Sequence, residues 1–579
     1  MKSHLLIFFL AAVCLPAISL SQPKKPASDL FERANKAYES KDYQGAIADY
    51  SEAIKFEPDY AEAYYGRGLT KFQLNDFQGS AADYTDAIRL KPDYAIAYYG
   101  RGYAKLKLAD FQGSIADYTE AMKLKQDFVE AFYGRGFAKF KLKDNQGAIA
   151  DYTEAIRIKT DYAEAYYGRG YAKSELNDIQ GAIADYIEAI KIKPDYTEAY
   201  YGKGLAKFKL KDYQGSAADF TDAIKVKPDY AEAFYNRGYA KFKLNDYPGS
   251  IDDYTGAVKL KPDYAEAYYG RGYAKFTSND FQGAIDDYTE AIKIKQDFAE
   301  VFYGRGLARF KLNDNQGSIA DFTDAVKLKP DFSEAYYNRG YAKFRLNDNQ
   351  GALADYTRAI NLKPEYSEAY YGRGYAKFKL RDHQGALADF TDAIKFKPDY
   401  AEACCGRGYV KSELKDNQGA VLDFTEAMKV RPDYVDAYYG RGYAKSELSD
   451  NQGSIADYTE AIKLKPDYSS AYYSRGLAKF KLNDFQGALA DYTEAIKLKP
   501  DYSSAYYGRG YTKFKLKDNQ GALADYTEAI KLKADYANAY YGRGLAYLSL
   551  DKKTEAKADF IKAIELGNHV PQKVLDMCN

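Results

Sequence analysis

Histidine is almost missing from this chain. Of 579 residues only three are histidine, at His4, His383 and His569. Hydrolases of the Ser-His-Asp or Cys-His type need a histidine base beside the nucleophile, and no such set can be assembled here. Neither histidine nor cysteine recurs at the spacing of metal ligands. We therefore predict a protein that is not an enzyme, with no catalytic residue, no cofactor and no metal.

Net charge is also missing. The chain has 83 Lys and Arg residues and 83 Asp and Glu residues, whereas a nucleic-acid-binding surface requires a clustered excess of basic residues. Acidic residues gather where helices are predicted to begin and lysines where they end, which is the distribution that the helix dipole favours. The composition therefore predicts no nucleic-acid partner.

Long apolar runs are missing too, apart from one near the N-terminus. Lys2 precedes the apolar run 5–13, and small residues follow before Gln22. This pattern predicts a secretory signal peptide over residues 1–21, because the run is too short to span a bilayer comfortably. A lipid anchor at Cys14 is the alternative, but the valine before it fits a lipidation motif poorly. We expect a secreted or periplasmic protein that does not insert into the membrane after the signal is removed.

One 34-residue unit fills the rest of the chain. It is repeated sixteen times over residues 27–570 without an insertion or deletion, and the proline of a Pro-Asp-Tyr motif marks the phase at Pro58, Pro92 and onward to Pro500. A fixed period of this length is typical of a solenoid. The period argues against most enzyme folds and predicts an interaction protein.

The array has distinct ends. A polar leader (22–26) precedes it and a short tail (571–579) follows it. The last copy, 537–570, carries polar residues such as Lys557 at positions that are apolar in the other copies. A terminal repeat needs a polar outer face because nothing stacks on it, so this copy is predicted to cap the array.

The residue pattern of each copy predicts a pair of antiparallel helices, a helical hairpin. In the copy 61–94, whose first residue Ala61 we call position 1, apolar residues recur at helical spacing over 61–74 and again over 78–90. Asp76, between these segments, is placed to accept the free backbone N–H groups of the second helix. The run from Asp59 to Glu62 predicts a capping box that opens the first helix.

Small and aromatic residues in these hairpins resemble those of the tetratricopeptide repeat (TPR) family. The matching residues in the copy 61–94 are Tyr64, Gly68, Ser80, Tyr84, Ala87 and Pro92. The resemblance covers about nine-tenths of the chain. It implies an all-α fold: a right-handed superhelical solenoid of sixteen 34-residue helix-turn-helix repeats, longer than one superhelical turn. It also implies that the first helices line a concave face.

Two charged positions depart from the family pattern, which usually has apolar residues there. Position 7 is Arg in fifteen copies and Lys203 in the other, and position 23 is Asp in all sixteen. We predict structural ion pairs between them in every hairpin, such as Arg67 with Asp83 and Arg101 with Asp117. Such pairs add little net stability but disfavour wrong registers.

The resemblance places positions 5, 9 and 12 on the concave face, where they form an aromatic stripe. Gly66 and its equivalents at position 6 are expected to leave backbone accessible beside the stripe. The alternative is that the tyrosines only pack between helices, since near-identical copies repeat a residue whether or not it is used. Position 5 gives the candidate partner-binding residues Tyr65, Tyr99, Tyr133, Tyr167, Tyr201, Tyr235, Tyr269, Tyr303, Tyr337, Tyr371, Tyr439, Tyr473, Tyr507 and Tyr541.

Two functions fit these observations. The first is a non-enzymatic scaffold outside the cytoplasm that binds a partner protein or an extended peptide on the concave face. The second is a protein that binds a glycan or cell-wall polysaccharide along the aromatic groove, because sugar rings stack on aromatic side chains. Tyrosine offers a large rigid surface and a hydroxyl group to either ligand.

Overall fold

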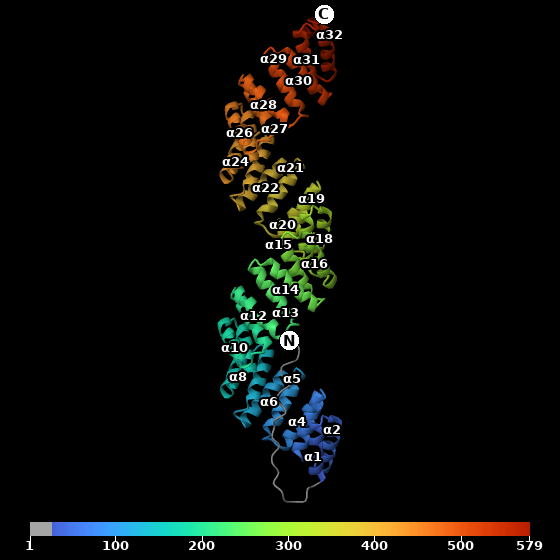
Figure 1. The fold of residues 1–579 in the computed structure, drawn as a ribbon, viewed down its shortest axis with the longest axis vertical. Coiled ribbons are helices and arrows are strands. Elements are labelled where there is room, and N and C mark those ends of the chain that lie inside the picture. The colour runs from blue at the N-terminus through green and yellow to red at the C-terminus, as the bar shows by residue number, and fades with distance from the viewer. Residues whose placement is uncertain (1–25, 579) are drawn as a thin grey trace. The chain divides into compact units, whose positions relative to one another are not determined.

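The structure is a computed structural model that describes residues 26–578 (Figure 1). Over this part of the chain it contains 33 helices and no strand. The chain has two compact units, Met1–Asn279 and Asp280–Asn579, and each is described by itself. The predicted signal peptide (1–21) and nearly all of the predicted leader lie outside the described residues.

The first unit consists of helices stacked side by side in chain order, coloured blue to green in Figure 1. The first helices of its hairpins are α1 (Pro26–Glu39), α3 (Ala61–Gln73), α5 (Ala95–Lys107), α7 (Val129–Lys141), α9 (Ala163–Glu175), α11 (Thr197–Lys209), α13 (Ala231–Lys243) and α15 (Ala265–Thr277). The second helices are α2 (Tyr43–Phe56), α4 (Phe77–Leu90), α6 (Phe111–Leu124), α8 (Asn145–Ile158), α10 (Ile179–Ile192), α12 (Tyr213–Val226) and α14 (Tyr247–Leu260).

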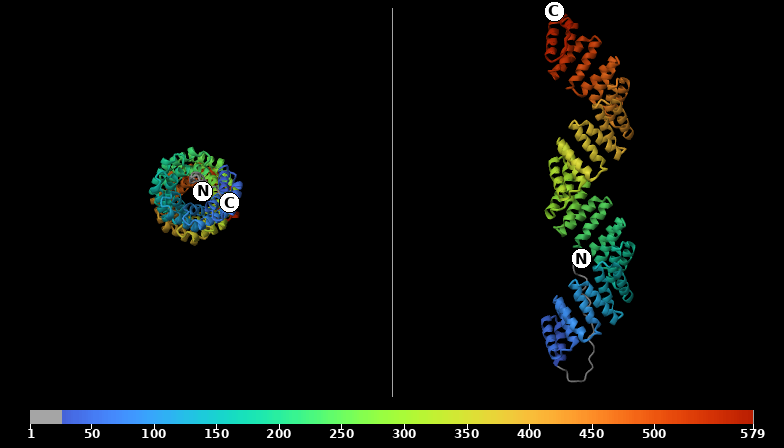
Figure 2. Two further views of the ribbon diagram at one scale, coloured as in Figure 1. Left: turned by 90° about the horizontal axis from the view of Figure 1, so that it is seen from below. Right: turned by 180° about the vertical axis from the view of Figure 1, so that it is seen from behind.

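The second unit is built in the same way, as the view from behind in Figure 2 also shows. Its second helices are α16 (Phe281–Ile294), α18 (Asn315–Leu328), α20 (Asn349–Leu362), α22 (His383–Phe396), α24 (Asn417–Val430), α26 (Asn451–Leu464), α28 (Phe485–Leu498), α30 (Asn519–Leu532) and α32 (Lys553–Glu565). Its first helices are α17 (Ala299–Lys311), α19 (Ser333–Arg345), α21 (Ser367–Lys379), α23 (Ala401–Glu413), α25 (Val435–Glu447), α27 (Ser469–Lys481), α29 (Ser503–Lys515) and α31 (Ala537–Ser549), and α33 (Gln572–Asp576) follows.

The prediction of an all-α fold made of helix-turn-helix repeats is confirmed. Most hairpin boundaries fall within a residue of those predicted from the periodicity: the copy 61–94 has helices at Ala61–Gln73 and Phe77–Leu90. The turn between them places Asn75 at a φ of 63°, and the equivalent residue of every other described hairpin is also in the left-handed region. No helix in residues 26–578 is both long enough and apolar enough to cross a bilayer.

The two helices of a hairpin begin differently. The carboxylate of Asp76 accepts a hydrogen bond of 2.8 Å from the backbone N–H of Gly79, so α4 has the predicted N-cap. The predicted capping box of α3 is wrong, because the cap residue is Tyr60 and no side chain caps that helix. Glu62 instead accepts a hydrogen bond of 3.0 Å from Lys91 of its own repeat.

Small residues allow the helices of a repeat to approach closely. Tyr84 of α4 is 2% exposed and Ala87 is fully buried. A Cβ atom added to Gly68 of α3 would lie 3.2 Å from the side chain of Tyr84 and 3.2 Å from the carbonyl oxygen of Ser80. The glycine is therefore required by the contact between α3 and α4, as the sequence indicated.

Each unit curves toward its first helices. Consecutive first helices contact one another, as α3 does with α5 and α19 does with α21, and no comparable series of contacts joins consecutive second helices in the described residues. Elements on the inner side of a bend approach more closely than those on the outer side. The face of the first helices, which carries positions 5, 9 and 12, is therefore the concave face of each unit.

Candidate binding face of the first helices

A column of buried carboxylates ties each first helix to its second helix. Asp83 is only 3% exposed, and Arg67 binds it with two hydrogen bonds, 3.0 Å from Nε and 2.7 Å from Nη2. Arg101 binds Asp117 in the same way, at 3.0 and 2.6 Å. A buried carboxylate that lost such partners would be strongly destabilising, so these pairs hold the hairpin in register.

Sequence reasoning missed two further members of this column. Lys71, at position 11, lies 2.8 Å from the second oxygen of Asp83. The third guanidinium nitrogen of Arg67, Nη1, donates a hydrogen bond of 3.1 Å to the hydroxyl of Ser51, at position 25 of the preceding repeat. The signal was present in the sequence, because position 11 is basic in all but the first and last copies and position 25 is nearly always Ser or Thr.

One copy shows that the arginine and the hydroxyl belong together. Position 25 is Ile187 in the repeat that precedes Lys203, and Lys203 is the only lysine at position 7. Lys203 still binds Asp219, at 2.9 Å. The guanidinium group is thus replaced in the one repeat whose preceding repeat has no hydroxyl at position 25 to accept its additional hydrogen bond.

The structure places the predicted partner-binding tyrosines of position 5 against neighbouring rings. The centroid of Tyr65 lies 5.5 Å from that of Tyr84 and 5.3 Å from that of Tyr94, and burial raises its pKa. The contact with position 24 recurs at Tyr99, Tyr133, Tyr167, Tyr201, Tyr235, Tyr303, Tyr337, Tyr371, Tyr439, Tyr473, Tyr507 and Tyr541. The centroid of Tyr269 lies 6.3 Å from that of Tyr273.

The glycine at position 6 does not expose backbone, contrary to expectation. A Cβ atom on Gly100 would lie 2.6 Å from Cζ of Tyr84, and one on Gly66 would lie 2.6 Å from Cζ of Tyr50. Position 6 is therefore covered by the position-24 ring of the preceding repeat. The glycine makes room for that ring.

Position 9 carries the aromatic side chains that face solvent. Tyr239 is 37% exposed, Tyr341 is 38% exposed and Tyr443 is 44% exposed. The phenylalanine at position 12 of the preceding repeat supports such a ring from one side, as Phe208 does for Tyr239 with centroids 4.9 Å apart. The exposed stripe thus runs through positions 9 and 12, next to the position-5 tyrosines.

Charges of opposite sign lie on the two sides of this stripe. Position 13, at the C-terminal end of the first helix, is lysine in eight of the sixteen copies and glutamate in four. The amino group of Lys243 lies 5.2 Å from the centroid of the Tyr239 ring. Position 2, at the N-terminal end, is usually glutamate. Some of these glutamates are paired, as Glu300 is with Lys329 at 3.1 Å. The face therefore has an aromatic centre with an acidic rim and a basic rim.

The stripe is interrupted at α23, where position 5 is Cys405. This side chain is 1% exposed, and burial raises the pKa of its thiol to about 12. The smaller residue lets Tyr409, at position 9, turn inward to the ring of Phe424, with centroids 5.0 Å apart. The hydroxyl of Tyr409 donates a hydrogen bond of 3.0 Å to the backbone oxygen of Asp436. One exposed aromatic of the stripe is thereby withdrawn into the core.

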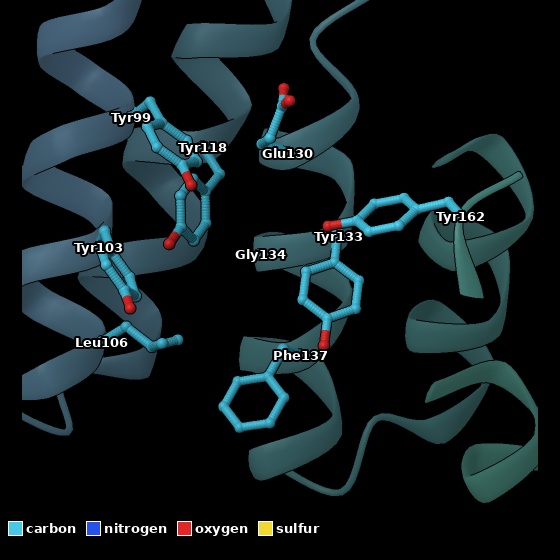
Figure 3. A pocket seen from close by; sticks show the side chains of 9 residues that line it. All are labelled: Tyr99, Tyr103, Leu106, Tyr118, Glu130, Tyr133, Gly134, Phe137 and Tyr162. Atoms are coloured by element: carbon cyan, nitrogen blue, oxygen red, sulfur yellow. The ribbon is translucent and has the colours of Figure 1, made fainter. Parts of the chain in front are cut away.

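A small pocket opens in the stripe between α5 and α7 (Figure 3). Its volume is about 40 Å³. Position 12 is Leu106 here, whereas it is phenylalanine in most copies, so the ring that would fill the space in front of Phe137 is absent. The lining residues are Tyr99, Tyr103, Leu106, Tyr118, Glu130, Tyr133, Gly134, Phe137 and Tyr162.

No group of three or more His, Cys, Asp or Glu side chains within residues 26–578 is arranged to hold a metal ion. The repeated hairpins with a shared concave face define an α-helical repeat protein, a class that commonly serves in protein–protein interaction.

Family profiles identify the particular repeat. The profile described as TPR repeat matches residues 34–75, 68–108, 138–177, 171–211, 204–245, 238–278, 272–313, 340–381, 446–483, 476–517 and 510–551. The profile described as Tetratricopeptide repeat matches residues 95–128, 299–332, 367–400 and 537–566. These matches cover well over half of the chain, which belongs to the tetratricopeptide repeat family.

Solved structures with similar folds include other TPR proteins. YrrB, described as a TPR protein with an unusual peptide-binding site, is 24% identical, with a TM-score of 0.30 over 32% of this chain and 96% of YrrB. A tetratricopeptide repeat protein from Parabacteroides merdae is 20% identical, with a TM-score of 0.34 over 42% of this chain and 98% of that protein. Yeast Tom70 is 17% identical, with a TM-score of 0.30 over 79% of this chain and 96% of Tom70. No curated protein sequence matches the chain.

Proposed function

We propose that this protein is a non-enzymatic scaffold that binds a partner protein, as an extended segment, on the concave face of its first helices. The observation that carries the proposal is the stripe of solvent-facing aromatics at position 9. Tyr239, Tyr341 and Tyr443 are each more than one-third exposed, and tyrosine gives a large contact area at low conformational cost. Membership of the TPR family supports a protein or peptide partner.

The charge pattern favours a peptide over a polysaccharide. The glutamates of position 2 and the lysines of position 13 offer both signs of charge to a ligand, which suits the mixed side chains of a polypeptide better than a neutral sugar chain. The relatives found by comparison give no support to a polysaccharide ligand. A protein partner is therefore the function that we propose.

We also propose that the scaffold acts outside the cytoplasm. The support is the sequence pattern of residues 1–21, in which an apolar run follows a basic residue and precedes small residues. Immunoblotting of cell fractions with an antibody against the repeats tests this. Recovery of an uncleaved chain from the cytoplasmic fraction would contradict it.

The partner-binding proposal is tested by affinity capture with the chain from residue 22 to 579. The test variant replaces three exposed tyrosines, Tyr239→Ala, Tyr341→Ala and Tyr443→Ala. The control variant replaces three leucines at the C-terminal ends of second helices, Leu260→Ala, Leu328→Ala and Leu464→Ala, which are 40–42% exposed. We expect a reproducible protein partner with the wild type and the leucine variant, and its loss with the tyrosine variant.

Circular dichroism should show the same helix content and melting temperature for both variants. Equal capture by the tyrosine and leucine variants would contradict a role for the stripe. Absence of any reproducible partner, together with binding of a soluble polysaccharide that depends on the three tyrosines, would favour the glycan alternative.

A further inference from the structure

We propose that the pocket between α5 and α7 binds the ammonium group of a lysine side chain in an extended peptide. This inference rests on the proposed function and names one side chain that the concave face selects. Nothing in the TPR repeat itself requires such a pocket, because it lies beside Leu106, the only leucine at position 12 in the first unit.

The size of the pocket sets the size of its occupant. A cavity needs about 10–15 Å³ to hold one water molecule, so the 40 Å³ of this pocket has room for a few non-hydrogen atoms. An ammonium group with its last methylene fits this space. A phenyl or sugar ring is too large for it.

The lining has the chemistry of a cation site. Rings of Tyr99, Tyr103 and Tyr118 lie on one side and those of Tyr133 and Phe137 on the other (Figure 3). The faces of aromatic rings attract cations. Tyr103 and Tyr133 are buried, at 5% and 3% exposed, so a cation between the rings would be largely shielded from water and the attraction would be stronger.

Glu130 supplies the only acidic side chain in the lining (Figure 3). The equivalent glutamates Glu62 and Glu300 are occupied by lysines of their own repeats, at 3.0 and 3.1 Å. Glu130 forms no ion pair within residues 26–578. A carboxylate beside aromatic rings complements a positive charge, and this one is available.

The chain itself shows that ammonium groups associate with these rings. The amino group of Lys107 lies 5.2 Å from the centroid of Tyr103, and that of Lys141 lies 5.2 Å from the centroid of Phe137.

The repeats provide a variant that fills the pocket without disturbing the fold. Position 12 is phenylalanine in most copies, and in the preceding copy Phe72 stacks on Tyr103 with centroids 4.7 Å apart. Leu106→Phe installs the same ring in front of Phe137. Glu130→Gln removes the charge at constant shape, and Glu232→Gln makes the same change at position 2 three repeats further on.

The experiment selects random peptides displayed on phage against the full chain from residue 22, in parallel with the Leu106→Phe variant. We expect peptides enriched only on the wild type to share one lysine. Replacing that lysine by norleucine should weaken binding about tenfold, measured by fluorescence anisotropy. Glu130→Gln should weaken binding by a similar factor, and Glu232→Gln should leave it unchanged.

Three results would overturn the inference. Peptides that bind the wild type and Leu106→Phe equally would show that the pocket is not used, while leaving the concave face as a binding surface. A shared apolar residue in place of lysine, insensitive to Glu130→Gln, would assign the pocket another occupant. Failure to enrich any peptide on either protein would contradict the proposed function as well.

Discussion

Most buried aspartates of position 23 are held by an arginine that also donates a hydrogen bond to the preceding repeat. Arg67 binds Asp83 within its own repeat and the hydroxyl of Ser51 in the repeat before it. Opposite charges at positions 7 and 23 could be paired from the sequence, because both positions are nearly invariant among the copies. The hydroxyl could not, since its contribution depends on the distance between repeats, which only the structure supplies.

Coupling between positions 25 and 7 can be measured at Ile187 and Lys203. Lys203→Arg alone should change stability little, because its additional donors face the isoleucine, and Ile187→Thr alone lacks the guanidinium partner. The double variant gains the inter-repeat hydrogen bond seen between Arg101 and Thr85 at 3.2 Å. We expect a favourable coupling energy of about 0.5–1.5 kcal/mol.

Hydrogen exchange of the amides of α10 and α11 measures this coupling as a local opening free energy. The wild type, the two single variants and the double variant form the cycle. Effects that add within about 0.3–0.5 kcal/mol would show that the hydroxyl and the arginine are independent.

Position 6 carries the clearest steric requirement. Gly100→Ala brings a Cβ atom to 2.6 Å from the buried ring of Tyr84, and overpacking of this kind costs about 1–3 kcal/mol. We expect Gly100→Ala to lower the unfolding free energy by that amount. Position 6 of another repeat is Ser474, so that site already accommodates a Cβ atom. Ser474→Ala should therefore change the unfolding free energy by less than about 0.5 kcal/mol.

Local hydrogen exchange around α4 and α5, and around α26 and α27, reports the two effects separately. Equal small effects at both positions would show that the tyrosine ring moves aside at little cost. The glycine would then be a product of repeat duplication and not a packing requirement.

At the scale of the helix, the two helices of a hairpin differ at the N-cap. An aspartate side chain caps the second helix, as at Asp76, whereas the cap residue of the first helix makes no side-chain hydrogen bond. Sequence reasoning predicted both caps, and the one at Asp76 is confirmed. The failure at α3 has a physical reason. Tyr60 is the residue at the cap position, and its ring packs toward Phe31 with centroids 5.0 Å apart. Aromatic packing within the preceding repeat therefore determines how the first helix begins.

This contrast predicts unequal costs for two aspartates of neighbouring turns. Asp76→Ala removes the hydrogen bond to the N–H of Gly79 and should destabilise α4 by about 1 kcal/mol. Asp59→Ala removes no cap of α3 and should cost less than about 0.5 kcal/mol. Amide exchange rates at the starts of α4 and α3 give both free-energy changes. A larger cost for Asp59→Ala than for Asp76→Ala would support the capping box predicted for α3.

For the whole molecule, the period predicted the repeated hairpins and left the use of the concave face open. Near-identical copies repeat a tyrosine whether it packs or binds, so the fourteen tyrosines of position 5 could not be told from the solvent-facing rings of position 9. Exposure separates Tyr239, Tyr341 and Tyr443 of position 9 from the tyrosines of position 5, because the latter pack on the position-24 ring of their own repeat. The pocket at Leu106 lay equally beyond sequence reasoning, since a missing ring matters only where a neighbour lines the gap.

The many buried tyrosines predict a definite alkaline limit to the stability of the protein. Burial raises the pKa of Tyr103, Tyr201 and Tyr337 to about 12, above the ordinary value of about 10 in an unfolded chain. Below pH 10 both states keep the proton, and stability is independent of these groups. Between pH 10 and 12 only the unfolded chain releases the proton, so stability falls as pH rises.

We therefore expect helix content to be constant up to about pH 10 and to be lost cooperatively above it. Tyrosinate absorbance should rise together with the loss of ellipticity. Gradual ionisation of most tyrosines with unchanged ellipticity would contradict the prediction, because it would place their hydroxyls in water.

Repetition gives the pocket at Leu106 a consequence beyond affinity. A ligand that recognises only the features shared by all copies has several equivalent registers along a stack, separated by one repeat, and can shift between them. A lysine held in the pocket beside Leu106, the only leucine at position 12 of the first unit, would fix the partner in a single register. The remaining residues of the partner would then each meet a defined repeat of the first unit. Small differences between the copies could then determine which partner sequence binds.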